Sequence, residues 1–205
     1  MKLIGMLDSP YVRRVAVSLR WLGMPYEHLP LSVFRNYDAF AEINPVVKAP
    51  TLVCDDGTVL MDSTLILEHV ETVAPAGRTL MPSAPPARSR TLRQTGLALA
   101  ACEKSVQLVY ERQLRPREKQ HLPWVERVSG QLHAALGQLE TELDGQTEAV
   151  ESGTLDQGLL TTAVTWYFAR ALLPDVVAPA QYPSLARLSR VAETLPAFRA
   201  APHEG

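Results

Sequence analysis

The sequence predicts a small α/β domain followed by an all-helical domain, and three observations support this prediction. Strand and helix patterns alternate at the start of the chain, a proline-rich stretch then interrupts the apolar pattern, and only helical patterns follow it. We therefore predict a first domain over 1–76, a linker over 77–86 and a helical domain over 87–205.

The first domain begins with a strand–helix–strand pattern. KLIGML at 2–7 is typical of a short buried strand, and apolar residues then recur at helical spacing from Tyr11 until Gly23. YEHLPL at 26–31 predicts a second strand. Two strands joined through a helix pair in parallel by a right-handed crossover, so this is a βαβ unit.

A hairpin and a helix complete the first domain. TLVC at 51–54 and TVLM at 58–61 are apolar strands joined across an Asp-Gly turn. A helix then begins at Asp62 or Ser63, with an inward stripe that we expect to contain Leu65, Ile66, His69 and Val70. The predicted order of the first domain is βαβ followed by ββα.

Four helical stretches make up the second domain. They span 90–115, 122–143, 153–173 and 182–200. The third is apolar on nearly every side, which predicts a buried central helix. Thr154 and Gln157 have the spacing of a capping box at its start.

Composition argues against several partners. The net charge is −2 and 46% of the residues are apolar, so no basic surface for nucleic acid or anionic lipid is indicated. No apolar run approaches the ~18 residues of a membrane span, and the apolar start is too short for a signal peptide. Cys54 and Cys102 lack metal-ligand spacing. We expect a cytoplasmic protein with two buried, reduced thiols, no metal and no membrane or nucleic-acid partner.

Three motifs carry a resemblance to a known family. They are SPYVRRV at 9–15, NPVVKAPTLVCDDGTVLMDSTLILEHV at 44–70, and GTLDQGLL at 153–160. Together they resemble the glutathione S-transferase family over essentially the whole chain. Ser9, the YER at 110–112 and HLPWVER at 121–127 look most like a bacterial subgroup of uncharacterised transferase-like proteins. Gln157 stands where the family usually has aspartate, which removes a charge from the helix start.

The resemblance implies a thioredoxin-like first domain that binds glutathione. It implies a cis Ala49–Pro50 bond, with the Ala49 backbone pairing with the cysteinyl unit like an added strand. Asp62 would meet the γ-glutamyl ammonium group, Ser63 and the helix start its carboxylate, and Lys48 the glycyl carboxylate. The alternatives are an ordinary loop proline, a helix cap and a solvated lysine.

Ser9 is the candidate for activating the thiol. A thiol attacks as thiolate, and lowering a pKa from ~8.5 to ~6.5 requires about 2.7 kcal/mol. A hydrogen bond from the Ser9 hydroxyl and the amides of Tyr11, Val12 and Arg13 at the helix start together supply this amount. Ser9 is otherwise only an N-cap, and no G-x-S-x-G pattern supports a covalent nucleophile. Tyr11 is a second candidate donor or a packing residue.

A second substrate would bind between the first helix and the long helix of the helical domain. The candidates are Tyr11, Tyr110, Arg112 and Arg115. The two arginines also suit a helix C-terminus without any ligand. Arg13 and Arg14 are expected to be solvated charges or cross-domain ion pairs.

The predicted function is that of a glutathione S-transferase-like detoxification enzyme acting on a small electrophile. The resemblance implies a homodimer with the helix after Asp62 near the interface. Two alternatives stay open. One is a glutathione-dependent isomerase or dehalogenase, because both begin from the same thiolate. The other is a non-catalytic binding module that keeps the fold.

Overall fold

The computed structural model describes residues 1–143 and 146–204 and divides the chain into two compact units. The first unit contains Met1–Met81 and also the segment from Thr194 onward, and the second is Pro82–Glu193. The C-terminal segment therefore lies in the first unit, whereas the sequence placed it in the helical domain. Helix α4 begins at Pro85, inside the predicted linker, because proline is well suited to a first helical turn.

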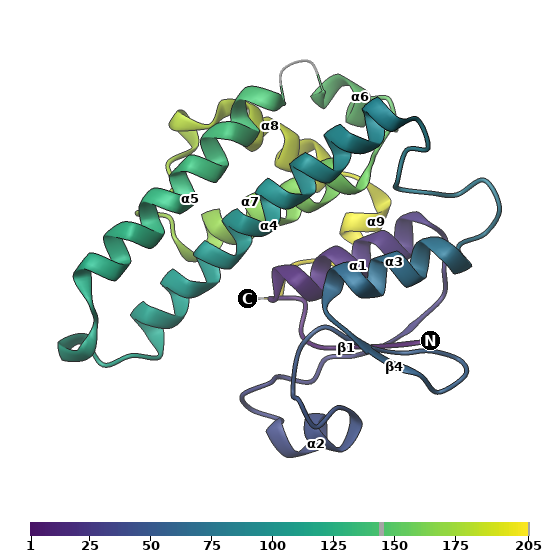
Figure 1. Ribbon diagram of the computed structural model, residues 1–205, viewed down its shortest axis with the longest axis horizontal. Helices are drawn as coiled ribbons and strands as arrows, with labels where there is room; N and C mark the ends of the chain where they lie inside the picture. The colour runs from purple at the N-terminus through teal and green to yellow at the C-terminus, as the bar shows by residue number, and fades with distance from the viewer. Residues whose placement is uncertain (144–145, 205) are drawn as a thin grey trace. The chain divides into compact units, whose positions relative to one another are not determined.

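The first unit is built on a four-stranded sheet with the order β2-β1-β3-β4. β1 pairs in parallel with β2 and antiparallel with β3, which pairs antiparallel with β4. Helices α1 and α3 lie together over one face, and α2 lies on the other side of the strands (Figure 1). The bounds are β1 Lys2–Ile4, α1 Pro10–Trp21, β2 Glu27–Leu29, α2 Tyr37–Ile43, β3 Thr51–Val53, β4 Val59–Met61, α3 Ser63–Val73 and α9 Pro196–Arg199. The predicted βαβ and ββα order is confirmed.

Two details of this unit differ from the sequence prediction. Helix α2 was not predicted, because it is only seven residues long and buries only Phe40. In α3, Leu65 is 58% exposed and Leu67 is buried in its place, so the predicted stripe is wrong at Leu65. Ile66 and Val70 are fully buried, as predicted.

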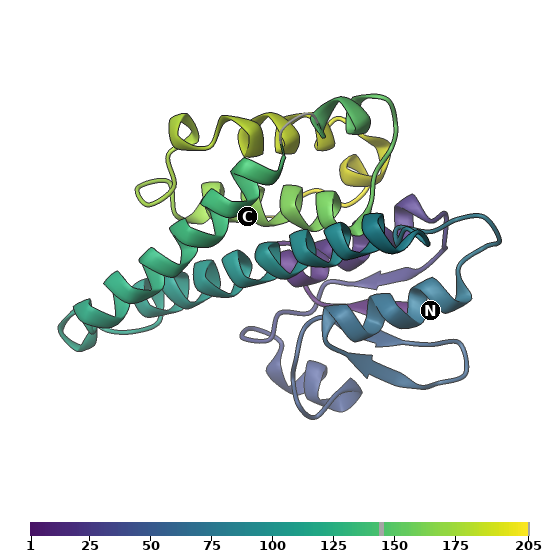
Figure 2. The ribbon, with the colours of Figure 1, turned by 45° about the horizontal axis from the view of Figure 1, so that its top comes forward.

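The second unit is all helical, as predicted. Its α-helices are α4 Pro85–Gln113, α5 Leu122–Glu142, α6 Thr147–Glu151, α7 Gln157–Leu172 and α8 Pro183–Ala192, with short 3-10 turns at Arg117–Lys119 and Pro179–Gln181. α4 packs against α5 and α7, and α7 also packs against α8 (Figure 2). α7 is buried along almost its whole length, which confirms the predicted central helix.

The start of α7 corrects the predicted capping box. Asp156, not Thr154, is the N-cap, and its Oδ1 accepts a hydrogen bond from Leu159 N at 2.9 Å. Its Oδ2 accepts from Thr91 Oγ1 of α4 at 2.5 Å. The Asp156 carboxylate thus accepts from one donor in α7 and one in α4. Gln157 is the first residue of α7, and its Nε2 donates to Thr161 Oγ1 and not back to the N-cap.

Cys54 and Cys102 are both free and buried, which confirms the predicted thiols. Within the described residues, no helix has the length and apolar character that crossing a membrane requires.

Candidate functional site

Ser9 is the N-cap of α1. Its Oγ accepts a hydrogen bond from Val12 N at 3.4 Å, and its carbonyl accepts from Arg13 N at 2.9 Å. The amides of Val12 and Arg13 are therefore used by Ser9 itself, which corrects the expectation that both donate directly to a sulfur. The helix still contributes the positive end of its macrodipole at Ser9. Because a hydroxyl accepts two bonds and donates one, accepting from Val12 leaves the Ser9 O–H as a donor.

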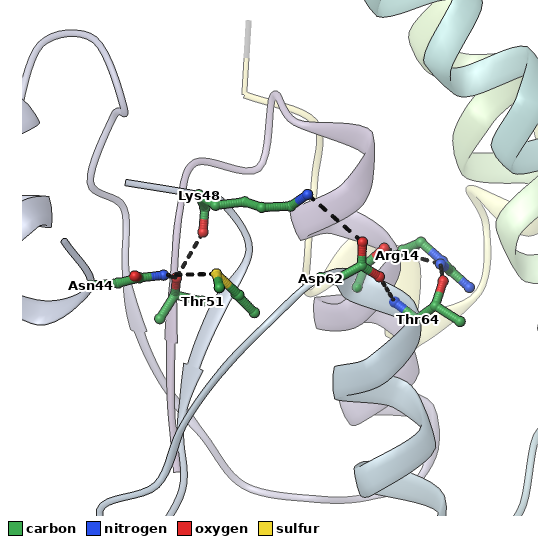
Figure 3. Close-up of polar contacts among 8 residues, drawn as sticks. Arg14, Asn44, Lys48, Thr51, Asp62 and Thr64 are labelled. Carbon is green, nitrogen blue, oxygen red and sulfur yellow. Dashed lines mark hydrogen bonds and ion pairs between the residues drawn. The ribbon is translucent and has the colours of Figure 1, made fainter. Parts of the chain in front are cut away.

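The turn before β3 contains the cis Ala49–Pro50 bond that the resemblance implied, and this expectation is confirmed. Two side chains hold the turn: Asn44 Nδ2 donates to Thr51 Oγ1 at 2.8 Å, and Thr51 Oγ1 donates to Lys48 O at 2.7 Å (Figure 3). Asn44 is buried, so this network is shielded from solvent. The sequence motif contained Asn44, but its role was not predicted.

The backbone of Ala49 lies at the end of an inner strand, not along an outer edge of the sheet. Within the described part of the chain, the Ala49 amide and carbonyl have no backbone hydrogen bond. A peptide pairing here would extend the ladder at the start of β3.

Gly5 brings the first turn of α1 close to this turn. It has φ +132°, and a Cβ there would lie 2.6 Å from Val12 Cγ2 and 3.1 Å from Ala49 Cβ. Any side chain at position 5 would therefore displace Val12 and Ala49 from their present positions. The glycine directly after a strand was the signal that would have revealed this close approach.

Asp62 and Ser63 form the start of α3. Figure 3 shows Asp62 at this position. Asp62 is the N-cap, and its Oδ1 accepts from Thr64 N at 2.9 Å. Its backbone has φ 73°, a region that non-glycine residues rarely adopt and that recurs at functional sites. Lys48 Nζ lies 3.9 Å from Asp62 Oδ2, so the two predicted anchors are near each other.

Arg13 and Arg14 contradict the expectation of solvated charges. Their side chains are 1% and 2% exposed. Arg13 Nε donates to Ala201 O at 2.9 Å, while Arg14 Nη1 donates to Ser63 Oγ at 3.0 Å and Thr64 Oγ1 at 3.2 Å. Sequence reasoning missed Arg14 as part of the site, because charged residues beside an apolar helical stripe usually face solvent.

The two arginine candidates in the second unit have ion-pair partners within that unit. Arg112 Nη1 lies 2.9 Å from Asp175 Oδ2, and Arg115 Nε lies 2.9 Å from Glu111 Oε2. Tyr110 is 45% exposed. An aromatic side chain that is partly exposed can contact a small molecule through its ring.

Cys54 is not arranged as a nucleophile. Its Sγ lies 3.6 Å from His69 Nε2, but burial and then the carboxylates of Asp56 and Asp55 raise the pKa of the thiol. A raised pKa keeps the thiol protonated and unreactive. Among the described residues, no group of three metal-ligating side chains comes together.

Comparison with known proteins identifies the architecture. Residues 3–78 match the family model for the glutathione S-transferase N-terminal domain. A glutathione transferase family member from Pseudomonas fluorescens Pf-5, solved with bound glutathione, superposes with a TM-score of 0.86 at 28% identity, over 100% of this chain and 99% of that one. The chain has the glutathione S-transferase fold. The predicted fold class is thereby confirmed.

Two further proteins are similar to this chain. An uncharacterised glutathione S-transferase-like protein of Escherichia coli K12, YibF, is 28% identical over 176 residues, which is 85% of each chain. A maleylacetoacetate isomerase from Methylobacterium extorquens AM1, solved with malonate and glutathione, superposes with a TM-score of 0.73 at 25% identity, over 98% of this chain and 95% of that one. The glutathione S-transferase fold is therefore shared with proteins of more than one named activity.

Proposed function

We propose that this chain is a glutathione S-transferase-like enzyme that ionises the thiol of bound glutathione at Ser9 and directs the thiolate at a small electrophile. The observation that carries the proposal is the close approach at Gly5, where Val12 of α1 and Ala49 both come near one backbone position. Val12 is about one helical turn from Ser9, so this approach supports a position of the Ser9 hydroxyl near the turn before β3. A cysteinyl unit paired with the Ala49 backbone would have its sulfur near Ser9.

The energetics favour a thiolate there. A hydrogen bond from the Ser9 hydroxyl to an anion contributes about 1.5–3 kcal/mol. The N-terminus of α1 adds about 0.3–1 kcal/mol, or up to about 2 kcal/mol when partly buried. Together the two contributions span about 2–5 kcal/mol, a range that includes the roughly 2.7 kcal/mol that a two-unit drop in thiol pKa requires. Ser9 accepts from Val12 N and so retains the proton that this bond needs.

The two ends of glutathione would bind at α3 and Lys48. Asp62 would pair with the γ-glutamyl ammonium group, and Ser63 with the α-carboxylate at the start of α3. Lys48, half-exposed beside the Ala49 turn, would face the glycyl carboxylate. The proposed glutathione-binding residues also include Pro50, which follows the cis peptide bond, and Val12, whose side chain lies beside Gly5.

Tyr11 of the first unit and Tyr110 of the second unit are each proposed as a candidate residue for recognising the electrophile. Arg112 and Arg115 are weaker candidates, because Asp175 and Glu111 already neutralise them. We also propose a cytoplasmic homodimer of the bacterial serine type with a role in detoxification. The exposed apolar side chains of Leu65 and Val73 on α3 favour an interface at that helix.

A glutathione-dependent isomerase or dehalogenase is the second candidate, because the same thiolate begins all three reactions. The isomerase from Methylobacterium extorquens among the structural neighbours favours keeping this candidate. A non-catalytic binding module is disfavoured by the retained Lys48, Ala49–Pro50 and Asp62–Ser63 set, which a scaffold without a ligand does not need.

Retention on immobilised glutathione, followed by ultraviolet difference spectra, tests the proposal. We expect the wild-type chain to bind and to show a thiolate band that is lost in Ser9→Ala, with Ser9→Thr retaining part of it. A panel of electrophiles, analysed for both conjugate and isomerised product, then separates transferase from isomerase. Binding without a thiolate band in the wild type would favour the binding module and contradict the enzyme proposal.

A further inference from the structure

The two adjacent arginines of α1 are equally buried but bond in different directions. Arg13 donates to Ala201 O at 2.9 Å and lies 5.8 Å from the centre of the Phe198 ring, in the C-terminal segment of the same unit. Arg14 donates to the hydroxyls of Ser63 and Thr64 at the start of α3. Arg13 therefore anchors the chain end, whereas Arg14 acts on a proposed ligand-binding residue.

Arg14 determines the direction in which the Ser63 hydroxyl can donate, because a hydroxyl has only one proton. A guanidinium only donates, so Ser63 Oγ must present a lone pair to Arg14 Nη1 at 3.0 Å. The single Ser63 proton is then directed away from the guanidinium. The bond from Arg14 uses Ser63 Oγ as an acceptor, which leaves its proton available for another partner. Ser63 is the first residue of α3, where the amides also favour an anion.

Burial strengthens this orientation. Arg14 is 2% exposed and Ser63 is 3% exposed, so water competes little for their hydrogen bond. A nearby cation also makes a hydroxyl that accepts from it a better donor, because the bonds polarise one another. Thr64 Oγ1 receives a second bond from the same nitrogen, which fixes the guanidinium with respect to α3.

We propose that Arg14 is a positioning residue that turns the Ser63 hydroxyl into a donor for the α-carboxylate of the γ-glutamyl group. The inference rests on the proposed function and adds to it a determinant of specificity. Arg14 selects thiol peptides that carry a carboxylate at this position. It does not touch the ligand or the thiol.

The test compares two ligands that differ only in this carboxylate. Glutathione is one probe, and 4-aminobutyryl-cysteinylglycine, which keeps the ammonium group and lacks the α-carboxylate, is the other. Calorimetric Kd values are measured for the wild type, Arg14→Lys and Arg13→Lys. Arg13→Lys is the matched control, because it makes the same change at an equally buried neighbour that faces Ala201. Thermal unfolding is measured for every variant.

We expect the wild type to prefer glutathione by about 10- to 100-fold, the range for a hydrogen bond to a charged group. Arg14→Lys should reduce this preference to below about 3-fold, while Arg13→Lys should retain it. A uniform weakening of both ligands in Arg14→Lys would mean a merely structural role and would overturn the inference. A wild type that binds neither ligand would instead overturn the proposed function.

Ser63→Ala provides a second route if Arg14→Lys fails to fold. This variant keeps Arg14 and removes the oriented hydroxyl, so we expect it to lose the preference for the carboxylate as well. A preference that persists in Ser63→Ala would overturn the inference, whatever the behaviour of the arginine variants.

Discussion

Lys48 Nζ lies 3.9 Å from Asp62 Oδ2, although the two residues were predicted to bind opposite ends of one ligand. Both side chains are about half-exposed, at 52% and 46%. An ion pair this open is worth about 0–1 kcal/mol, so a bound peptide can replace it at low cost. In the proposed complex, the charged groups of the peptide would take the place of this pair.

Replacing Lys48 should affect binding far more than folding. In Lys48→Met we expect the free energy of unfolding to change by less than about 0.5 kcal/mol, because only an exposed ion pair is lost. The Kd for glutathione should rise by about 3- to 10-fold, and less so in high salt. Urea unfolding and calorimetry at two salt concentrations check this. A loss of stability without a change in Kd would contradict the assigned role.

Replacing Asp62 with glycine should weaken glutathione binding without reducing the stability of the protein. Its φ of 73° costs about 1–3 kcal/mol in a non-glycine residue, and glycine relieves this strain. Asp62→Gly loses the cap to Thr64 N, so we expect unchanged or increased stability together with weaker glutathione binding. Asp62→Ala is the control, because it loses the same cap and keeps the strain. An Asp62→Gly variant less stable than Asp62→Ala would be the contrary result.

Two alanine substitutions can show which residue caps α7. Asp156→Ala removes the acceptor of Leu159 N and of Thr91 Oγ1, and should cost about 1–3 kcal/mol. Thr154→Ala, at an exposed position outside the helix, should change stability by less than about 0.5 kcal/mol. Denaturant midpoints of the two variants distinguish these positions. A larger loss of stability in Thr154→Ala than in Asp156→Ala would instead support the capping box that the sequence predicted.

Cys54 should make the protein less stable in alkali. Burial raises the pKa of this thiol in the folded state, so the unfolded chain ionises first as pH increases. The stability that the protonated thiol contributes is complete below the unfolded pKa of ~8.5 and is lost above it. The stability difference between wild type and Cys54→Ala should therefore shrink as the pH increases above about 8.5. A constant difference in urea midpoint would contradict this.

Phe198 should be essential to the first unit even though it lies close to the C-terminus. It is fully buried and faces Arg13 of α1. Phe198→Ala should cost about 3–5 kcal/mol, while Tyr37→Ala, at a 56% exposed aromatic, should cost much less. Thermal unfolding of the two variants tests this. Equal losses would mean that the C-terminal segment is not part of the unit's core.

Local patterns in the sequence determined the strands, the first helix, the hairpin and the buried α7, because hydrophobic periodicity and turn residues act over a few positions. Ser9 as an N-cap followed from the same kind of local signal. Helix α2 was too short for its periodicity to be recognised. The resemblance supplied Lys48, Ala49, Pro50, Asp62 and Ser63 as a set.

The tertiary structure alone decided which residues from distant segments meet. Arg14 bonds Ser63 across 49 positions, and Arg13 reaches Ala201 across 188. Gly5 has no side chain, so Val12 and Ala49 can both lie close to it. Asp156, not Thr154, is the N-cap of α7, because Thr91 of α4 supplies a second donor. Such pairings depend on how helices and strands pack against one another. The periodicity of one helix or strand does not show which residues of another element it will contact.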